Sequence, residues 1–302
     1  MGYNKPKETT RNYLENAPLP NHGKSYTVIS HKQVIDSTKQ LLADSGFIIQ
    51  NELYRANMDA NVAQGIYHIL PINTVDPTIM EEKELGMMFA WTNSYDKSTR
   101  FQCAIGAYVI VCHNGMVAGD MMNFKRKHTG SADHDIRMQI SNQIKNAEKY
   151  YKRILNDRDA MRNTELSLQE QAEIAGRLYI SEDILDAAQM SCVKGELEKP
   201  SYDYQCDQLN AWTFYNHVTH ALKKAHPRDW LSDSQNFHDF MTAKVLSKMN
   251  ITMSDALDLS EFDTTQDTDL NITMQEWNEN AIEIDEDITR SRLVQDVYLM
   301  KD

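Results

Sequence analysis

Two strand-like segments joined by a short turn constrain the fold of this chain more than any other feature. Residues 86–92 and 99–111 are rich in β-branched, aromatic and other apolar side chains. The residues between them, 93–98 (NSYDKS), are mostly turn formers. This pattern predicts a β-hairpin. The Asn114-Gly115 dipeptide that follows predicts a second turn.

Helical patterns surround these strands. Residues 31–45 predict a helix, and residues 47–57 and 65–71 predict two strands after it. A long basic helix is predicted over residues 133–160, because its apolar side chains recur every three or four positions. Further helices are predicted in residues 167–188, 204–226 and 236–248. The sequence therefore predicts an α+β fold: an antiparallel β-hairpin or meander, then a long basic helix, then a helical C-terminal half.

Charge is divided unevenly along the chain. The formal net charge is −13 over 302 residues, yet residues 251–302 alone hold 14 acidic and 3 basic side chains. Because the remainder is close to neutral, it can carry local basic patches for a polyanion. We predict four regions, namely a flexible N-terminal arm (1–24), an α+β core with the hairpin and long helix (25–165), a helical subdomain (166–250) and an acidic C-terminal segment (251–302).

The sequence predicts a cytoplasmic protein without a membrane partner. No apolar run approaches the roughly 18 residues of a membrane span, and the first residues contain no signal-peptide pattern. The four cysteines form no close pair in sequence, which favours reduced thiols over a disulfide framework.

Motifs of the common catalytic sites are missing from the sequence. It contains no GxxxxGK[ST], GxGxxG, GxSxG, HExxH or CxxC pattern. His217 and His220 share one face of a predicted helix, as metal ligands can, but their aromatic and apolar neighbours favour a packed helix. Cys112 and His113 would point to opposite faces of a strand, which is poor geometry for a nucleophile and its base. We predict no catalytic residue, no metal and no cofactor, and therefore a protein that is not an enzyme.

Basic residues gather around the predicted hairpin and long helix. Residues 125–127 (KRK) precede the helix, and further cations form a ridge beside its apolar stripe. Cations near an aromatic ring are typical of a groove for single-stranded nucleic acid, although a solvated helix face has the same charges. The residues predicted to bind nucleic acid are Tyr95, Lys97, Arg100, Lys125, Arg126, Lys127, Arg137, Lys145 and Lys149.

Five short stretches carry a family resemblance: residues 93–98 (NSYDKS), 111–116 (VCHNGM), 125–128 (KRKH), 212–216 (WTFYN) and 226–230 (HPRDW). In this order they resemble the DUF932 family (domain of unknown function 932) of phage- and plasmid-associated proteins, over residues 25–245. The resemblance implies a phage or plasmid context and no settled activity. The order of hairpin, strand and basic helix is also similar to the β-β-β-α core of Rad52-type single-strand annealing proteins. Those proteins tend to be basic through this core, whereas residues 1–150 carry a net charge of only +1.

The motif residues have expected structural roles. Asn93 and Asp96 are expected to cap the hairpin turn through side-chain hydrogen bonds, and Gly115 to supply a positive φ. Lys97 and Arg100 are harder to explain by folding, so they are the better candidates for ligand contact.

Together these features predict a non-enzymatic phage or plasmid protein that binds single-stranded DNA, and that promotes strand annealing as a homo-oligomer. The acidic segment would recruit a host or phage protein, or restrain DNA binding. The alternative is a phage protein that inhibits a host defence system by protein–protein binding, with the acidic segment occupying the DNA-binding groove of a nuclease.

Overall fold

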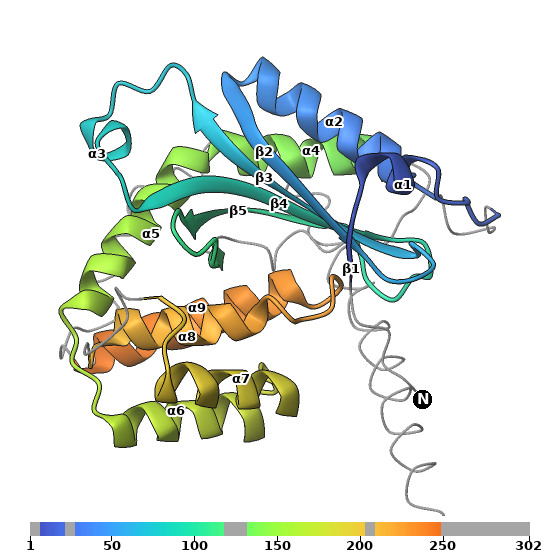
Figure 1. The fold of residues 1–302 in the computed structure, drawn as a ribbon. Coiled ribbons are helices and arrows are strands. Elements are labelled where there is room, and N and C mark those ends of the chain that lie inside the picture. Colours follow the sequence, from blue (N-terminus) through green and yellow to red (C-terminus); the bar gives the residue numbers. More distant parts are fainter. Residues whose placement is uncertain (1–6, 22–27, 118–131, 203–208, 249–302) are drawn as a thin grey trace, which may run out of the picture. The chain divides into compact units, whose positions relative to one another are not determined.

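The computed structural model describes residues 7–21, 28–117, 132–202 and 209–248 (Figure 1). In chain order its elements are β1 (Lys7–Thr9), α1 (Arg11–Glu15), α2 (His31–Asp44), β2 (Phe47–Ala56), β3 (Val62–Pro71), α3 (Pro77–Met80), β4 (Leu85–Ser94), β5 (Gln102–Val109), β6 (Gly115–Val117), α4 (Ala132–Lys145), α5 (Ala147–Arg162), α6 (Leu168–Ile180), α7 (Ala187–Glu198), α8 (Ala211–Leu222) and α9 (Trp230–Lys248).

Within the described residues, six strands form one sheet in the order β1-β2-β3-β4-β5-β6, and every neighbouring pair is antiparallel. This meander contains the predicted hairpin as β4 and β5, and the described residues after β6 are mainly helical. The α+β class and the antiparallel meander are therefore confirmed. The predicted strands 47–57 and 65–71 correspond to β2 and β3.

Helices cover both faces of the sheet, as Figure 1 shows for α2 and α4 on one side and α8 and α9 on the other. The α4 face, which packs against α2, α4 and α5, buries Tyr67, Phe89 and Trp91 completely. The Trp91 indole N–H donates to the Tyr67 hydroxyl at 3.1 Å, so the polar atoms of this aromatic core are partnered. The opposite α9 face buries small side chains of β4 and β5 beneath Trp230 and Leu231 of α9.

The helix predicted over residues 133–160 is divided into two consecutive helices, α4 and α5. Asn146 lies between them with φ −98° and ψ 10°, and its side chain gives no cap to α5. Its amide donates instead to the carbonyl of Asn142 in the preceding turn, at 3.0 Å. Asparagine side chains form such local hydrogen bonds in competition with the helix backbone, which makes asparagine unfavourable inside a helix. The helix therefore breaks at Asn146, although the apolar residues on either side keep their helical spacing.

Part of the predicted N-terminal arm is built into the sheet. β1 pairs with the end of β2, where Glu8 lies opposite Arg55. α1 begins after Thr10, whose hydroxyl accepts from the backbone N–H of Tyr13, and its Leu14 side chain is 1% exposed. Elements of three and five residues are too short for a periodic pattern, which is why the sequence analysis did not find them.

In the described part of the chain, no helix is long and apolar enough to cross a membrane.

Candidate nucleic-acid interface

The structure separates the cations that the sequence analysis assigned to one site. Lys97 and Arg100 lie in the turn between β4 and β5. Lys149 lies in α5, whose Tyr151 hydroxyl donates to the carbonyl of Leu85 at the opposite end of β4, at 2.5 Å. A ten-residue strand spans about 30 Å. The hairpin turn and α5 are therefore at opposite ends of the sheet and do not form one site.

The other predicted cations lie elsewhere. Arg137 and Lys145 are exposed on α4, and the Arg137 guanidinium donates to the hydroxyl of Ser37 in α2 at 3.3 Å. Lys125, Arg126 and Lys127 lie outside the described residues, so their place relative to the hairpin stays a prediction.

Tyr95 was predicted as a stacking platform for bases, and its position contradicts this role. The side chain is 4% exposed. Its ring is stacked on the His31 imidazole with centroids 3.9 Å apart and an angle of 10° between the planes. Its hydroxyl accepts from the backbone N–H of His31 at 2.7 Å. Tyr95 therefore fixes the start of α2 against the hairpin and has no free face for a ligand.

Four cations of α5 form ion pairs with carboxylates: Lys152–Asp76, Arg153–Asp157, Arg158–Glu82 and Arg162–Glu84. These contacts tie α5 to the segment that leads into β4 and to its own next turn. Lys152 and Arg153 of the predicted ridge are thus paired with carboxylates, whereas Lys145 and Lys149 are exposed and their role as phosphate ligands stays a prediction.

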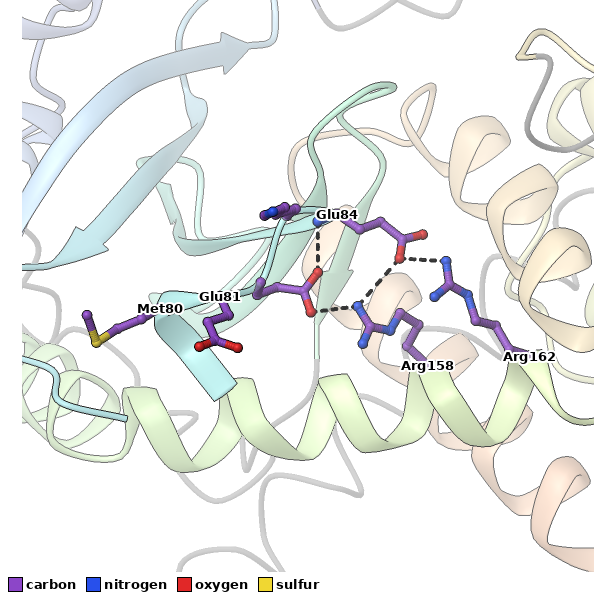
Figure 2. Close-up of a pocket in the computed structure, with 7 residues that line it drawn as sticks. Met80, Glu81, Glu84, Arg158 and Arg162 are labelled. Atoms are coloured by element: carbon purple, nitrogen blue, oxygen red, sulfur yellow. Dashed lines mark hydrogen bonds and ion pairs between the residues drawn. The ribbon is translucent and has the colours of Figure 1, made fainter. Parts of the chain in front are cut away.

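Figure 2 shows the pocket of about 590 Å³ at this junction, lined by residues 80–84 together with Arg158 and Arg162. The Glu84 carboxylate accepts from Arg162 at 2.6 Å and from the Trp212 indole at 3.2 Å, and it lies 3.4 Å from Arg158. Burial alone would raise the pKa of Glu82, but the bond from Arg158 and backbone N–H donors lower it. The pocket is lined by a charge network that joins β4, α5 and α8.

The turn motif NSYDKS has two structural roles. Asp96 accepts from the backbone N–H of Ser98 at 2.9 Å, which is the expected turn cap. Asn93 does not cap the turn. Its amide donates to the carbonyl of Ile29 at 3.0 Å and lies 3.0 Å from the Nδ1 atom of His31, so it attaches the start of α2 to β4.

The VCHNGM motif joins the sheet to α8 and α9. His113, and not Gly115 as expected, takes the positive φ of the turn, at 55°. Gly115 is required for another reason, because a Cβ there would lie 2.7 Å from the ring of Trp230. The Asn114 amide donates to the backbone carbonyl of Asn216 at 3.0 Å. The motifs VCHNGM, WTFYN and HPRDW therefore meet at one packed junction.

A further junction brings the hairpin turn next to the HPRDW segment. The Thr92 hydroxyl, at the end of β4, donates to the carbonyl of Pro227 at 3.1 Å. Burial lowers the pKa of His226, and the hydrogen bond with Asp229 raises the pKa of Arg228. The negative charge of Asp96 in the turn has a smaller, raising effect on both groups, so the turn lies close to this loop. We call this surface the hairpin end and define it as the turn residues 95–100, the loop residues 225–229 and Arg55.

Arg55 is the cation at the hairpin end that the sequence analysis missed. Its guanidinium donates to the carbonyl of Ala225 at 2.6 Å and to the side-chain oxygen of Gln64 at 3.2 Å. Within the described residues it forms no ion pair, although Glu8 raises its pKa slightly. Burial lowers the pKa of Arg55 to about 10, so it still carries its charge at neutral pH. A half-buried arginine bound only to neutral oxygens is suited to an anionic ligand.

Arg228 completes the group and was also missed, although it stands in the HPRDW motif. It is exposed and forms a bidentate pair with its neighbour Asp229, at 2.8 and 3.0 Å. Burial lowers the pKa of His226 most, and Arg228 and Arg55 lower it further, whereas Asp229 and Asp96 raise it. The imidazole is therefore neutral at pH 7, and the hairpin end holds four cations, Arg55, Lys97, Arg100 and Arg228.

The histidine pair on α8 belongs to a buried cluster with α7. Glu196 accepts from the backbone and hydroxyl of Ser201 at 3.0 and 2.5 Å, and its oxygens lie 3.8 Å from His217 Nδ1 and 3.7 Å from His220 Nε2. Burial lowers the pKa of both imidazoles, and Glu196 raises it. No group of three or more His, Cys, Asp or Glu residues in the described ranges is arranged to hold a metal ion. The cluster is consistent with a packing role at the α7–α8 contact.

Comparison with known proteins gives one match. The model of the family described as "Domain of unknown function (DUF932)" matches residues 18–269. No curated protein matches the chain, and no solved structure matches it.

Proposed function

The chain belongs to the DUF932 family, whose function is unknown, and we propose that it is a non-enzymatic protein that binds single-stranded DNA through its hairpin end. In this proposal it acts in the cytoplasm of a host cell as a phage- or plasmid-encoded homo-oligomer, and it promotes strand annealing in recombination. Lys97 and Arg100 keep the roles expected for them, and Arg55 and Arg228 join them.

The observation that supports this proposal best is the environment of Arg55. The guanidinium of Arg55 is held by neutral oxygens at a surface with four cations and two carboxylates, Asp96 and Asp229, of which Asp229 is paired with Arg228. The surface therefore carries a net positive charge in an acidic chain. Phosphate oxygens are the natural ligand of such a group, since guanidinium–phosphate bonds are strong and often bidentate. On α5, Lys152, Arg158 and Arg162 are each paired with carboxylates of other elements.

A single strand fits this site better than a duplex. Arg55 is recessed between the sheet and the loop 225–229, where its guanidinium bonds to Ala225. A flexible single strand can bring one phosphate toward a recessed cation, whereas duplex DNA is stiff over about 150 base pairs and presents its phosphates on a rigid cylinder.

Fluorescence anisotropy tests the proposal with a labelled single strand of about 40 nucleotides and with its duplex, each at two salt concentrations. We expect salt-sensitive binding that favours the single strand. Absence of binding at low salt, by folded protein with and without residues 251–302, would reject DNA binding. Changing Lys125, Arg126 and Lys127 to Ala tests the remaining predicted cations, because an unchanged affinity in the folded triple variant would remove them from the site.

One observation favours the second candidate, inhibition of a host defence protein by protein–protein binding. Residues 251–302 hold 14 acidic side chains and 3 basic ones, a density that resembles the charge of nucleic acid. Deleting this segment separates the two functions. If the protein binds DNA, the deletion leaves the affinity for a single strand equal or makes it tighter; if the segment occupies a partner's groove, the deletion abolishes binding to that partner.

A further inference from the structure

We propose that the open part of the α9 face, along β2 and β3 as far as the exposed ring of His113, holds the bases of the single strand whose phosphates bind at the hairpin end. This inference rests on the proposed function and adds a location and a chemistry for base contact, which the loss of Tyr95 from the predicted site leaves unassigned.

The α9 face of β2 and β3 begins at the hairpin end and runs away from it. Arg55 lies opposite Gln64, Leu53 opposite Ile66, Asn51 opposite His68, and Ile48 opposite Leu70. Because paired residues of an antiparallel sheet point to the same face, these side chains form a continuous band. None of them is acidic, in a chain with a net charge of −13, so a polyanion can follow the band without repulsion from its side chains.

The far end of this band is open to solvent and begins with an apolar pair, next to Asn51 and the buried His68. Ile48 and Leu70, which face each other across β2 and β3, are each 47% exposed, and Asn51 is exposed beside them. The helices cover a different region of the same face, since α9 contacts β4, β5 and β6. Exposed apolar side chains in a row mark a contact surface, and the cations at its near end indicate which partner it takes.

Three rings with nearly parallel planes stand next to this band. The centroids of His68 and Tyr108 are 3.6 Å apart with an angle of 9° between the planes. The imidazole of His113 lies 5.6 Å from His68 and 6.0 Å from Tyr108, at 13° and 17°. Tyr108 can lie this close to the strand because residue 86 is glycine, where a Cβ would come within 2.3 Å of the Tyr108 ring.

Of these three rings only that of His113 is open to solvent, since His68 and Tyr108 are 5% and 9% exposed and are stacked on each other. His113 is exposed, and within the described residues no hydrogen bond reaches the imidazole of His68 or the hydroxyl of Tyr108. Burial, with a smaller effect of His113, lowers the pKa of His68 to about 4, so this ring is neutral at pH 7. The exposed ring of His113, beside the neutral imidazole of His68, suits stacking with nucleobases of any sequence.

The spacing fits a short stretch of strand. Gln64, which lies opposite Arg55, and His68 are four residues apart on β3, which corresponds to about 13 Å, and Leu70 lies about 20 Å from Gln64. At roughly 3.4 Å for each stacked nucleotide, the band accommodates a few bases.

The experiment compares a thymidine oligonucleotide with an abasic oligonucleotide of the same length and phosphate charge. Wild type is expected to bind the thymidine strand at least tenfold more tightly, roughly the effect of one stacked base. His113→Asn removes the exposed ring, and asparagine tolerates the positive φ of 55° at this position. We expect this variant to lose most of the preference for bases while its affinity for the abasic strand and its salt dependence stay unchanged.

Leu70→Gln is the second variant, because it changes the exposed apolar band and leaves the turn of His113 intact. Ile180→Gln is the matched control, since Ile180 is 80% exposed at the end of α6. Thermal unfolding checks that each variant is folded. Equal affinity of wild type for both strands, or an unchanged ratio in both His113→Asn and Leu70→Gln, overturns the base platform with DNA binding intact. Failure of wild type to bind either strand overturns the proposed function itself.

Discussion

Removing two cations from the hairpin end should reduce the salt dependence of DNA binding by a calculable amount. The double variant Lys97→Asn, Arg228→Gln removes two of the four cations there and leaves Arg55 and Arg100. Both positions are on the surface, and the φ of 63° at Lys97 is one that asparagine accepts. The fold should therefore be unchanged, and the change in binding should be electrostatic.

The magnitude follows from counterion release. Each phosphate contact with a single strand contributes about −0.7 to the slope of log affinity against log salt concentration. Four contacts give a slope of about −2.8, so affinity falls about 50-fold between about 50 and 200 mM salt; two contacts give about −1.4 and a fall of about sevenfold. Contacts elsewhere on the protein add equally to both slopes, so the decisive quantity is the difference of about 1.4.

Anisotropy titrations of wild type and variant at four or more salt concentrations measure this difference. The matched control is the double variant Lys145→Gln, Lys149→Gln, which removes the same charge from exposed positions on α4 and α5. We expect the control to bind with the wild-type slope. If the control flattens the slope as much as the hairpin variant, or if neither variant changes it, the assignment of phosphate binding to the hairpin end is wrong.

Three further predictions concern stability. Gly106→Ala should unfold the protein or lower its free energy of unfolding by more than about 3 kcal/mol, because the added Cβ would lie 2.1 Å from a backbone carbonyl of β6. The matched control is Gly176→Ala in α6, where an added Cβ meets nothing within 4 Å. It should raise the free energy of unfolding in urea by about 0.5–1 kcal/mol. Burial lowers the pKa of His31 to about 4; above pH 6.5 the ring is neutral in both states, and between pH 6.5 and 4 only the unfolded chain gains the proton. The free energy of unfolding should therefore fall by about 3 kcal/mol from this group as the pH drops from 7 to 4, and a His31→Gln variant with an equally steep decline would contradict this. Glu84→Gln should lower stability by about 1–3 kcal/mol by weakening the bonds to buried Arg158, while Glu81→Gln in the same pocket should change it by less than about 0.5 kcal/mol; similar losses in both would refute the role of the network.

Local sequence patterns were sufficient for the four long strands of the sheet, and they missed the three-residue strands β1 and β6. The hairpin of β4 and β5 was predictable because its strand-forming residues and its turn lie within one short stretch, and the cap from Asp96 to Ser98 spans only two residues. The same reasoning placed β2 and β3. It failed at Asn146, where a side-chain bond to the preceding turn breaks a helix whose apolar stripe continues.

The candidate site depends on contacts between residues far apart in sequence, and for that reason it could be predicted only in part. Tyr95 resembled an exposed aromatic residue in a turn, but a histidine 64 positions earlier covers its ring and binds its hydroxyl. Arg55 gave no signal in the sequence, because the carbonyl that holds it belongs to Ala225, 170 residues later. Residue type predicted which side chains can bind phosphate, and only the fold shows which of them have neutral partners.

The motifs that define the family resemblance mostly hold the fold together. Asn93 secures the start of α2, Asn114 binds the backbone of α8, and Gly115 admits the ring of Trp230. Such residues specify how the helical half is attached to the sheet, so we expect their substitution to lower stability and, with it, any activity. A loss of function on changing Asn93, Asn114 or Gly115 would therefore not identify the ligand. The informative positions are the exposed ones that this junction brings together, above all Lys97 and Arg228, because changes there alter charge and leave the packing intact.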